Sequence, residues 1–162
     1  NAPVHCGSGG GRYDNSGGHA GSLIRIESAG NIEMNGTISS RGANGGAYNA
    51  GGSGGGVFIK CNLFSGGPGS LIDVSVGNRG RGYSTLGAGG GGRIAIWYGS
   101  FEPQEREAIM NGIFIQKMFT TNTLKSYMGT LVADGGTGYQ NGEEGTALFV
   151  TIRRLGMMIV IR

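Results

Sequence analysis

Residues 87–98, GAGGGGRIAIWY, join a run of glycine directly to a run of alternating apolar residues. In the second half Ile94, Ile96 and Tyr98 alternate with other residues, which is the period-two pattern of a β-strand. The first half consists almost entirely of the residue that costs most conformational entropy to order. Glycines placed immediately before a strand therefore need a structural reason, and their positions along the chain indicate what it is.

Glycine dominates the composition, with 37 of the 162 residues, whereas proline supplies only 3. The usual glycine share is about 7%, and so little proline fits neither collagen nor a proline-rich linker. Hydrophobic residues still make up 38% of the chain and cluster between the glycine tracts, which argues against a disordered chain. The length favours one domain with its own core over residues 1–162.

Charge and hydropathy exclude two classes of partner. The formal net charge of +3 is mild, and the lysines and arginines are scattered rather than gathered in a basic stripe, so we expect no nucleic-acid binding. The longest apolar stretch, LGMMIVIR at 155–162, is far shorter than the roughly 20 residues of a membrane-spanning helix. We therefore expect no membrane insertion.

The pattern of residues 87–98 is repeated along the chain. Small residues lead into alternating apolar ones at 17–28, 51–62, 87–98 and 141–152, and weaker period-two strands follow at 31–40, 69–78 and 129–138. The first three strong segments are almost evenly spaced, and the fourth lies further on. Regular short strands with glycine- and asparagine-rich connections predict a sheet that coils on itself.

A β-solenoid fits this description best. Each strand would pair with its equivalents one coil above and below, and its inward residues would stack into an apolar column. The predicted inward residues are Ile24, Ile26, Ile32, Met34, Val57, Ile59, Ile72, Val74, Val76, Ile94, Ile96, Leu131, Ala133, Leu148 and Val150. The predicted outward residues are Arg25, Glu33, Phe58, Asp73 and Ser75. A β-sandwich is the structural alternative, and it would require tight hairpins between strands.

The glycine tracts have two explanations in such a coil. Glycine can adopt positive φ at sharp turns, or it can let neighbouring backbones approach where a Cβ would collide. Stacked tracts could then form a layer of extended, polyglycine-like segments that bond to one another.

The predicted layout has five parts. Residues 1–16 form an N-terminal glycine-rich arm, 17–100 and 129–152 form the repeat coils, 101–128 are an insertion, and 153–162 are a C-terminal strand. Within the insertion, EPQEREAIM at 102–110 could form a short helix, and IFIQKMF at 113–119 reads as an additional strand.

Three segments carry a resemblance to a known family. GGSGGGVFIKCN (51–62), GGGGRIAIWYGS (89–100) and GTLVADGGTGYQNGEEGTALFV (129–150) resemble the glycine-rich parallel β-helix repeats of secreted and cell-surface proteins of adhesin- or fibre-like type. The resemblance implies a right-handed parallel β-helix outside the cytoplasm, with a role as a stalk, adhesin or fibre. It brings no catalytic site with it, because the matching positions are structural glycines and core residues.

Catalytic and metal-binding chemistry is poorly represented. A polysaccharide lyase-like enzyme needs several carboxylates on one face to hold calcium, yet no two of Asp14, Asp73 and Asp134 share a strand. The adjacent Glu143 and Glu144 would face opposite sides of a strand. His5 and His19 lie in glycine-rich segments and read as loop residues. We therefore expect no catalytic residue, metal or cofactor, with a lyase-like enzyme as the weaker alternative.

The sequence contains a candidate disulfide and a candidate glycosylation site. Cys6 and Cys61 lie far apart in the sequence and could form a disulfide between the arm and the body, and the alternative is two separate thiols. Asn35, followed by Gly36 and Thr37, is an acceptor sequence for N-glycosylation.

Aromatic residues suggest a carbohydrate-binding alternative. Trp97, Tyr98 and Tyr139 lie in or beside glycine tracts, where aromatic faces with polar edges could stack on sugars. The competing explanation is that they pack over bare glycine backbone.

The C-terminus suggests self-assembly. A strand formed by Met157, Met158, Ile159, Val160 and Ile161 would be an apolar joint for another copy of the chain. A head-to-tail contact of this kind does not close on itself and grows a fibre. We therefore expect a secreted or cell-surface structural protein that forms a homopolymeric filament. The alternative is an adhesin or carbohydrate-binding module of a larger surface protein, with a surface polysaccharide as partner.

Overall fold

The structure is a computed structural model, and it describes residues 2–12, 17–81, 86–99, 118–119 and 126–151. These ranges contain no helix. Their strands are β1 (Leu23–Glu27), β2 (Ile32–Met34), β3 (Thr37–Ser39), β4 (Gly56–Cys61), β5 (Phe64–Gly66), β6 (Leu71–Asp73), β7 (Arg93–Tyr98), β8 (Met118–Phe119), β9 (Thr130–Val132) and β10 (Thr146–Thr151).

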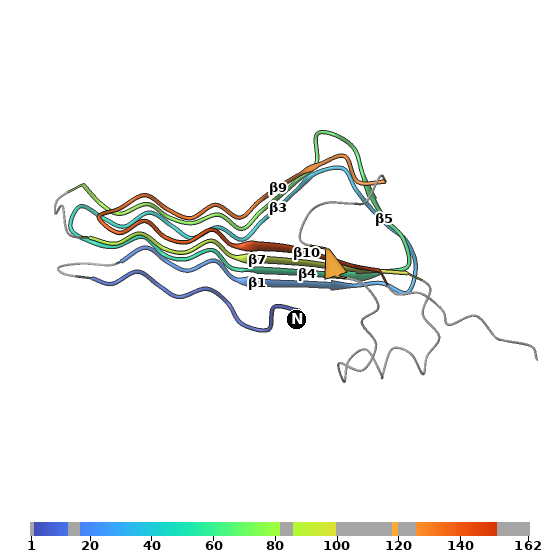
Figure 1. Cartoon of the computed structure of the whole chain (residues 1–162), viewed down its shortest axis with the longest axis horizontal. Helices are drawn as coiled ribbons and strands as arrows, with labels where there is room; N and C mark the ends of the chain where they lie inside the picture. The colour runs from blue at the N-terminus through green and yellow to red at the C-terminus, as the bar shows by residue number, and fades with distance from the viewer. Residues whose placement is uncertain (1, 13–16, 82–85, 100–117, 120–125, 152–162) are drawn as a thin grey trace, which may run out of the picture.

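The strands form three sheets, and, apart from β7 and β8, strands that follow one another in the sequence lie in different sheets (Figure 1). The large sheet has the order β1-β4-β7-β10-β8, and the smaller ones have the orders β2-β5 and β3-β6-β9. Every described pair is parallel except β10 with β8. Within the described residues, the prediction of an all-β fold whose equivalent strands stack in parallel is confirmed, and the repeat strands do not pair as sandwich hairpins.

Residues 126–128 extend the smallest sheet. Tyr127 forms a parallel bridge with Gly66, whose N–H donates to the Ser126 carbonyl at 3.1 Å. The Tyr127 side chain is buried against Phe64, with ring centroids 5.0 Å apart. The last residues of the predicted insertion over 101–128 therefore lie against the β2-β5 sheet.

The rest of that insertion lies largely outside the described residues. This is true of the predicted helix at 102–110 and of most of the predicted strand at 113–119. The described part of that strand, β8, is extended and pairs antiparallel with β10.

The apolar core lies between the sheets. Its buried members are Met34, Val57, Ile59, Cys61, Phe64, Ile72, Val74, Ile94, Ile96, Tyr127 and Phe149. Most of the predicted inward residues belong to this cluster or pack against it. Of the predicted outward residues, Arg25 and Glu33 are exposed, whereas Phe58 faces away from the core but is itself buried.

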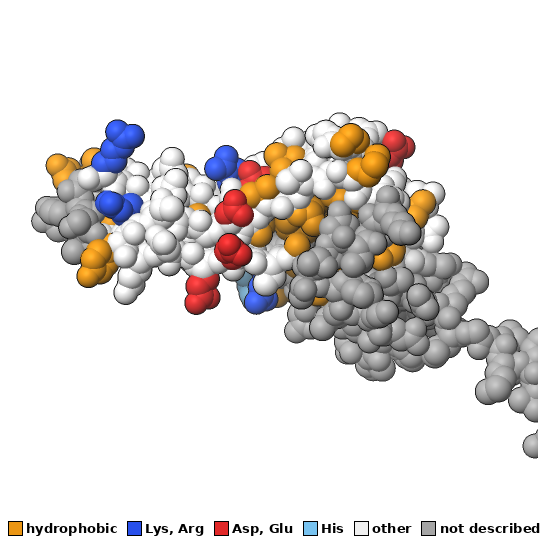
Figure 2. Space-filling model, turned by 45° about the horizontal axis from the view of Figure 1, so that its top comes forward, with side chains coloured by type: hydrophobic (Ala, Val, Ile, Leu, Met, Phe, Trp, Pro, Cys, Tyr) orange, Lys and Arg blue, Asp and Glu red, His pale blue; other side chains and the backbone are white. Residues whose placement is uncertain are grey.

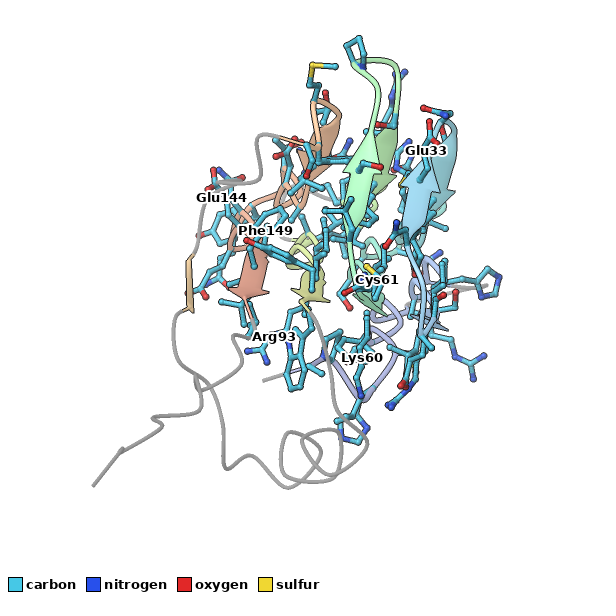
Figure 3. The ribbon with its side chains drawn as sticks, turned by 90° about the vertical axis from the view of Figure 1, so that its right-hand side faces the viewer. Glu33, Lys60, Cys61, Arg93, Glu144 and Phe149 are labelled. Carbon is cyan, nitrogen blue, oxygen red and sulfur yellow. The ribbon has the colours of Figure 1, made fainter. Side chains whose placement is uncertain are left out.

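The prediction for β10 was wrong by one residue. Ala147 pairs with Ile94, so Ala147 and Phe149 face the core, as Figure 3 shows for Phe149. The predicted inward residues Leu148 and Val150 lie on the opposite face of the sheet. Both faces of β10 carry apolar side chains, so alternation alone could not decide which face is inward, and a slip of one residue exchanges the faces.

The glycine tracts form the other half of the molecule. Leading segments (17–22, 50–55, 86–92 and 142–145) enter the large sheet, and trailing segments (40–46, 74–80 and 133–137) leave the β3-β6-β9 sheet. Figure 1 shows them as long extended chains lying side by side.

Hydrogen bonds join these segments at three-residue intervals. Gly18 and Gly21 donate to Ala50 and Ser53 at 2.9 Å, in parallel. Between the two kinds of segment the direction is antiparallel, with Gly77 donating to Gly52 at 3.0 Å and Gly80 to Asn49 at 2.9 Å. Three residues per turn is the period of the polyproline II conformation, which has no internal hydrogen bonds and so bonds only to its neighbours. The suggested layer of bonded, polyglycine-like segments is confirmed.

Close approach, rather than turning, is what the glycines provide. Among the described residues only Gly99 has positive φ, at 140°, so the proposed use of glycine at sharp corners does not account for the tracts. A Cβ built on Gly77 would instead collide with the carbonyl of Ala43 and lie 2.6 Å from the nitrogen of Asn44. The tract before Ile94 is therefore a straight continuation of β7 that lies against other backbones.

This geometry predicts opposite effects for two alanine substitutions within the tracts. Gly77→Ala should lower the free energy of unfolding by at least the ~1–3 kcal/mol typical of overpacking. Gly87→Ala should be neutral or stabilising by up to ~1 kcal/mol, because no atom lies within 4 Å of its Cβ and the unfolded chain loses freedom. Urea denaturation of both variants measures the difference, and equal destabilisation would contradict the close-approach explanation.

Candidate functional site

The predicted sugar-stacking residues are not brought together. Trp97 is only 6% exposed and packs edge-on against Phe58, with ring centroids 5.4 Å apart, on the outer face of the large sheet. Tyr98 faces the other way and packs against the core. Tyr139 lies in the glycine region and is 68% exposed. Of the three, Tyr139 alone presents most of its ring to solvent.

The two cysteines are free thiols in the structure. Cys61 is fully buried in the core at the end of β4, and Cys6 is exposed on the arm. Burial raises the pKa of the Cys61 thiol to about 11, and a hydrogen bond with the backbone of Ile32 acts in the opposite direction. The structure therefore has two separate thiols, which is the alternative to a Cys6–Cys61 disulfide.

Asn35 is exposed just after β2. Its amide donates to Glu33 Oε1 at 2.9 Å, and its Oδ1 accepts from the N–H of Gly67 at 3.4 Å. The side chain is therefore on the surface, where an N-glycosylation acceptor has to be. The predicted assembly strand, Met157–Ile161, lies outside the described residues.

The charged residues of the described ranges either make structural contacts or are dispersed over the surface. No group of three or more His, Cys, Asp or Glu side chains in these ranges could hold a metal ion. Asp73 pairs with Arg41 at 3.3 Å and accepts from the N–H of Ser75 at 2.9 Å. His5 and His19 are exposed. In the same ranges, no helix has the length and apolar character needed to cross a membrane.

The two margins of the large sheet differ. At one margin β8, which is part of the strand predicted at 113–119, covers β10 beside Phe149 and Val150. At the other margin β1 is the outermost described strand. Exposed Arg25 and Glu27 form an ion pair there, and Lys60 lies 3.7 Å from the Glu27 carboxylate. Charged side chains on an edge strand discourage unspecific pairing.

A polar ladder runs across the free end of the glycine region. The Asn78 N–H donates to Asn44 Oδ1 at 2.9 Å, and the Thr137 N–H donates to Asn78 Oδ1 at 3.0 Å. A hollow of about 310 Å³ lies here, lined by residues 78–81 and 137–138. Sequence reasoning missed this ladder, although the asparagines that close successive glycine tracts could have indicated it.

The free end also exposes aromatic and basic side chains. Tyr48 is 40% exposed and Tyr139 68%. Arg79 and Arg81 line the hollow, and Figure 2 shows basic and apolar side chains gathered at this end.

Comparison of the chain with protein-family models, with curated proteins and with solved structures found no match.

The two thiols should differ in reactivity. At pH 8 iodoacetamide should alkylate Cys6 in the native protein, and Cys61 only after denaturation, because Cys61 is both buried and protonated. A folded-state pKa above the ordinary 9.0 also means that this thiol's contribution to stability falls as the pH rises from about 9 to 11. Peptide mass mapping measures the labelling, and native alkylation of Cys61 at the rate of Cys6 would contradict the arrangement.

Proposed function

We propose that the chain is a structural extracellular protein, built as a right-handed parallel β-helix and acting as the protomer of a head-to-tail filament or surface fibre. The observation that carries the proposal is the equivalence of successive passes of the chain, since β1, β4, β7 and β10 stack in parallel and in register. A stack of equivalent layers can be continued by another copy wherever an outer strand is available.

The outer strand β1 supports this assembly. It pairs with β4 on one side, and no described strand pairs with its other side. Addition of an extended strand to such an edge is a common mode of protein association. At the opposite margin of the large sheet, β8 already pairs with part of β10. Another copy can therefore join there only along the part of β10 that β8 leaves open, or through the predicted strand Met157–Ile161.

The glycine region supports a mechanical role. Its backbone groups bond between segments that are distant in the sequence, so extension of the chain must break bonds between many segments rather than within one. The extracellular location and the adhesin- or fibre-like class come from the resemblance of the repeats.

Deletion of residues 155–162 should abolish filaments. The intact chain should form filaments in negative-stain electron microscopy, and the truncated chain should remain particulate, because it lacks the proposed joint strand. Tyr139→Ala, at the far end of the glycine region, is the matched control and should assemble normally. Urea denaturation of the truncated chain must show that it is folded. Filaments of unchanged length from a folded truncated chain would exclude this joint.

An adhesin or carbohydrate-binding module is the second candidate function. It is favoured by the free end of the glycine region, where exposed Tyr48 and Tyr139 lie with a hollow lined by Arg79 and Arg81. Aromatic faces beside polar groups are typical of sugar-binding surfaces.

Tyr139→Ala should then reduce glycan-array binding at least ~10-fold, which corresponds to about 1.4 kcal/mol. Leu63→Ala is the control, because Leu63 is also exposed (45%) but lies among the strands. Equal signals from both variants, or no glycan bound by the intact chain, would exclude sugar binding at this end. Size-exclusion chromatography separates the two functions, because a binding module should remain monomeric.

A further inference from the structure

The N-terminal arm shows how the glycine region binds an extended segment. Residues 7–11 lie in a groove between the leading segments 17–22 and 50–55, called here the first groove. The arm donates twice to one wall and accepts twice from the other. The bonds are Gly7 N–H to Gly21 O, Gly10 N–H to Gly18 O, Ala50 N–H to Gly11 O and Ser53 N–H to Ser8 O, all at 2.9 Å.

One serine adds a side-chain contact to this groove. Ser53 Oγ accepts from the N–H of Ser8 at 2.6 Å and donates to the carbonyl of Ser8 at 3.1 Å. The arm fits because it is made of glycine where it touches the walls. A Cβ on Gly10 would collide with the carbonyl of Ala50.

The same walls recur one layer further along the stack. Leu23 of β1 pairs with Gly56 of β4, which in turn pairs with Arg93 of β7. By this register Gly18 and Gly21 correspond to Gly51 and Gly54, and Ala50 and Ser53 correspond to Gly87 and Gly90. The segments 50–55 and 86–92 therefore form a second groove beside the arm.

The second groove has the bonding groups of the first, and no described segment occupies it. The carbonyls of Gly51 and Gly54 and the N–H groups of Gly87 and Gly90 form no hydrogen bond within the part of the chain that the structure describes. A hollow of about 450 Å³ opens at one end of this groove. It is lined by arm residues 2–8 on one side and by 53–56 and 91–93 on the other. Backbone groups left without partners cost free energy once water is excluded from them.

We propose that the second groove binds an extended glycine-rich segment of another polypeptide, running in the direction of the arm. The arm is the template for this occupant: glycine is required where the segment lies against the walls, and donors and acceptors must follow at three-residue intervals. The chain's own arm already fills the first groove, and the occupant that we assign to the second is a segment of a partner. The proposal concerns a lateral surface and does not depend on head-to-tail assembly.

A peptide with the arm's own sequence is the direct probe. Residues 4–12 with Cys6→Ser should bind the intact chain saturably at ~1 mM or below, and the amide NMR signals of Gly87 and Gly90 should shift. The same peptide carrying Gly7→Val and Gly10→Val should not bind. No binding by the first peptide would overturn the proposal. So would shifts confined to Ala50 and Ser53, because they would indicate exchange with the arm in the first groove.

Two substitutions at one position test the groove itself. A Cβ on Gly90 meets only the Glu143 carbonyl, at 3.7 Å, so a side chain there is compatible with the fold and would occupy the groove. Gly90→Val should weaken peptide binding at least ~10-fold, whereas Gly90→Ser should retain it, because serine reproduces the hydroxyl of Ser53. Equal binding by both variants would overturn the proposal. If Gly90→Val does not fold, the amide NMR shifts that the peptide causes in the unmodified chain still test the proposal.

Discussion

The approach of one glycine backbone to another is the contact on which the structure depends. Each extended segment has no internal hydrogen bonds, so its N–H and C=O groups must find partners on neighbouring segments. Partners at 2.7 to 3.2 Å are within reach only if no Cβ stands between the chains. Ordering a residue's backbone costs about 1–2 kcal/mol, and glycine loses the most freedom. A tract of this composition can therefore be ordered only as part of a bonded bundle.

The strand-rich half follows from the same alignment. At Gly92 and Arg93 the chain passes without a turn from three-residue bonding to a parallel strand. Because the bundle already holds the leading segments side by side, β1, β4, β7 and β10 begin level with one another, and their inward side chains stack in one core. Cys61 and Phe149 point into that core from different strands, whereas Lys60 points away from it (Figure 3).

Sequence reasoning predicted the parts of this arrangement that repeat. The parallel stacking, most inward side chains and the bonded glycine layer follow from the spacing of the tracts and from alternation. It was wrong where local pattern carried no information. Both faces of β10 are apolar. The register of β10 with β7 therefore decides that Phe149, rather than Leu148, enters the core. Tyr127 could not be assigned to a sheet because residues 126–128 lack the repeat's pattern and are placed by Gly66 and Phe64.

The candidate sites were harder to predict because they depend on which residues from different layers meet. Trp97 and Tyr98 are neighbours in sequence but lie on opposite faces of β7. The ladder through Asn44, Asn78 and Thr137, and the second groove, arise only from stacking.

The return of the chain at Ser126 shows how the smallest sheet keeps its spacing without a glycine tract. Tyr127 and Met128 complete this sheet, and their partners are Phe64 and Gly66. A Cβ on Gly66 would lie 2.6 Å from the Met34 carbonyl oxygen and 2.8 Å from the Tyr127 ring. A single glycine on the middle strand thus sets the distance between three successive layers on this side of the molecule.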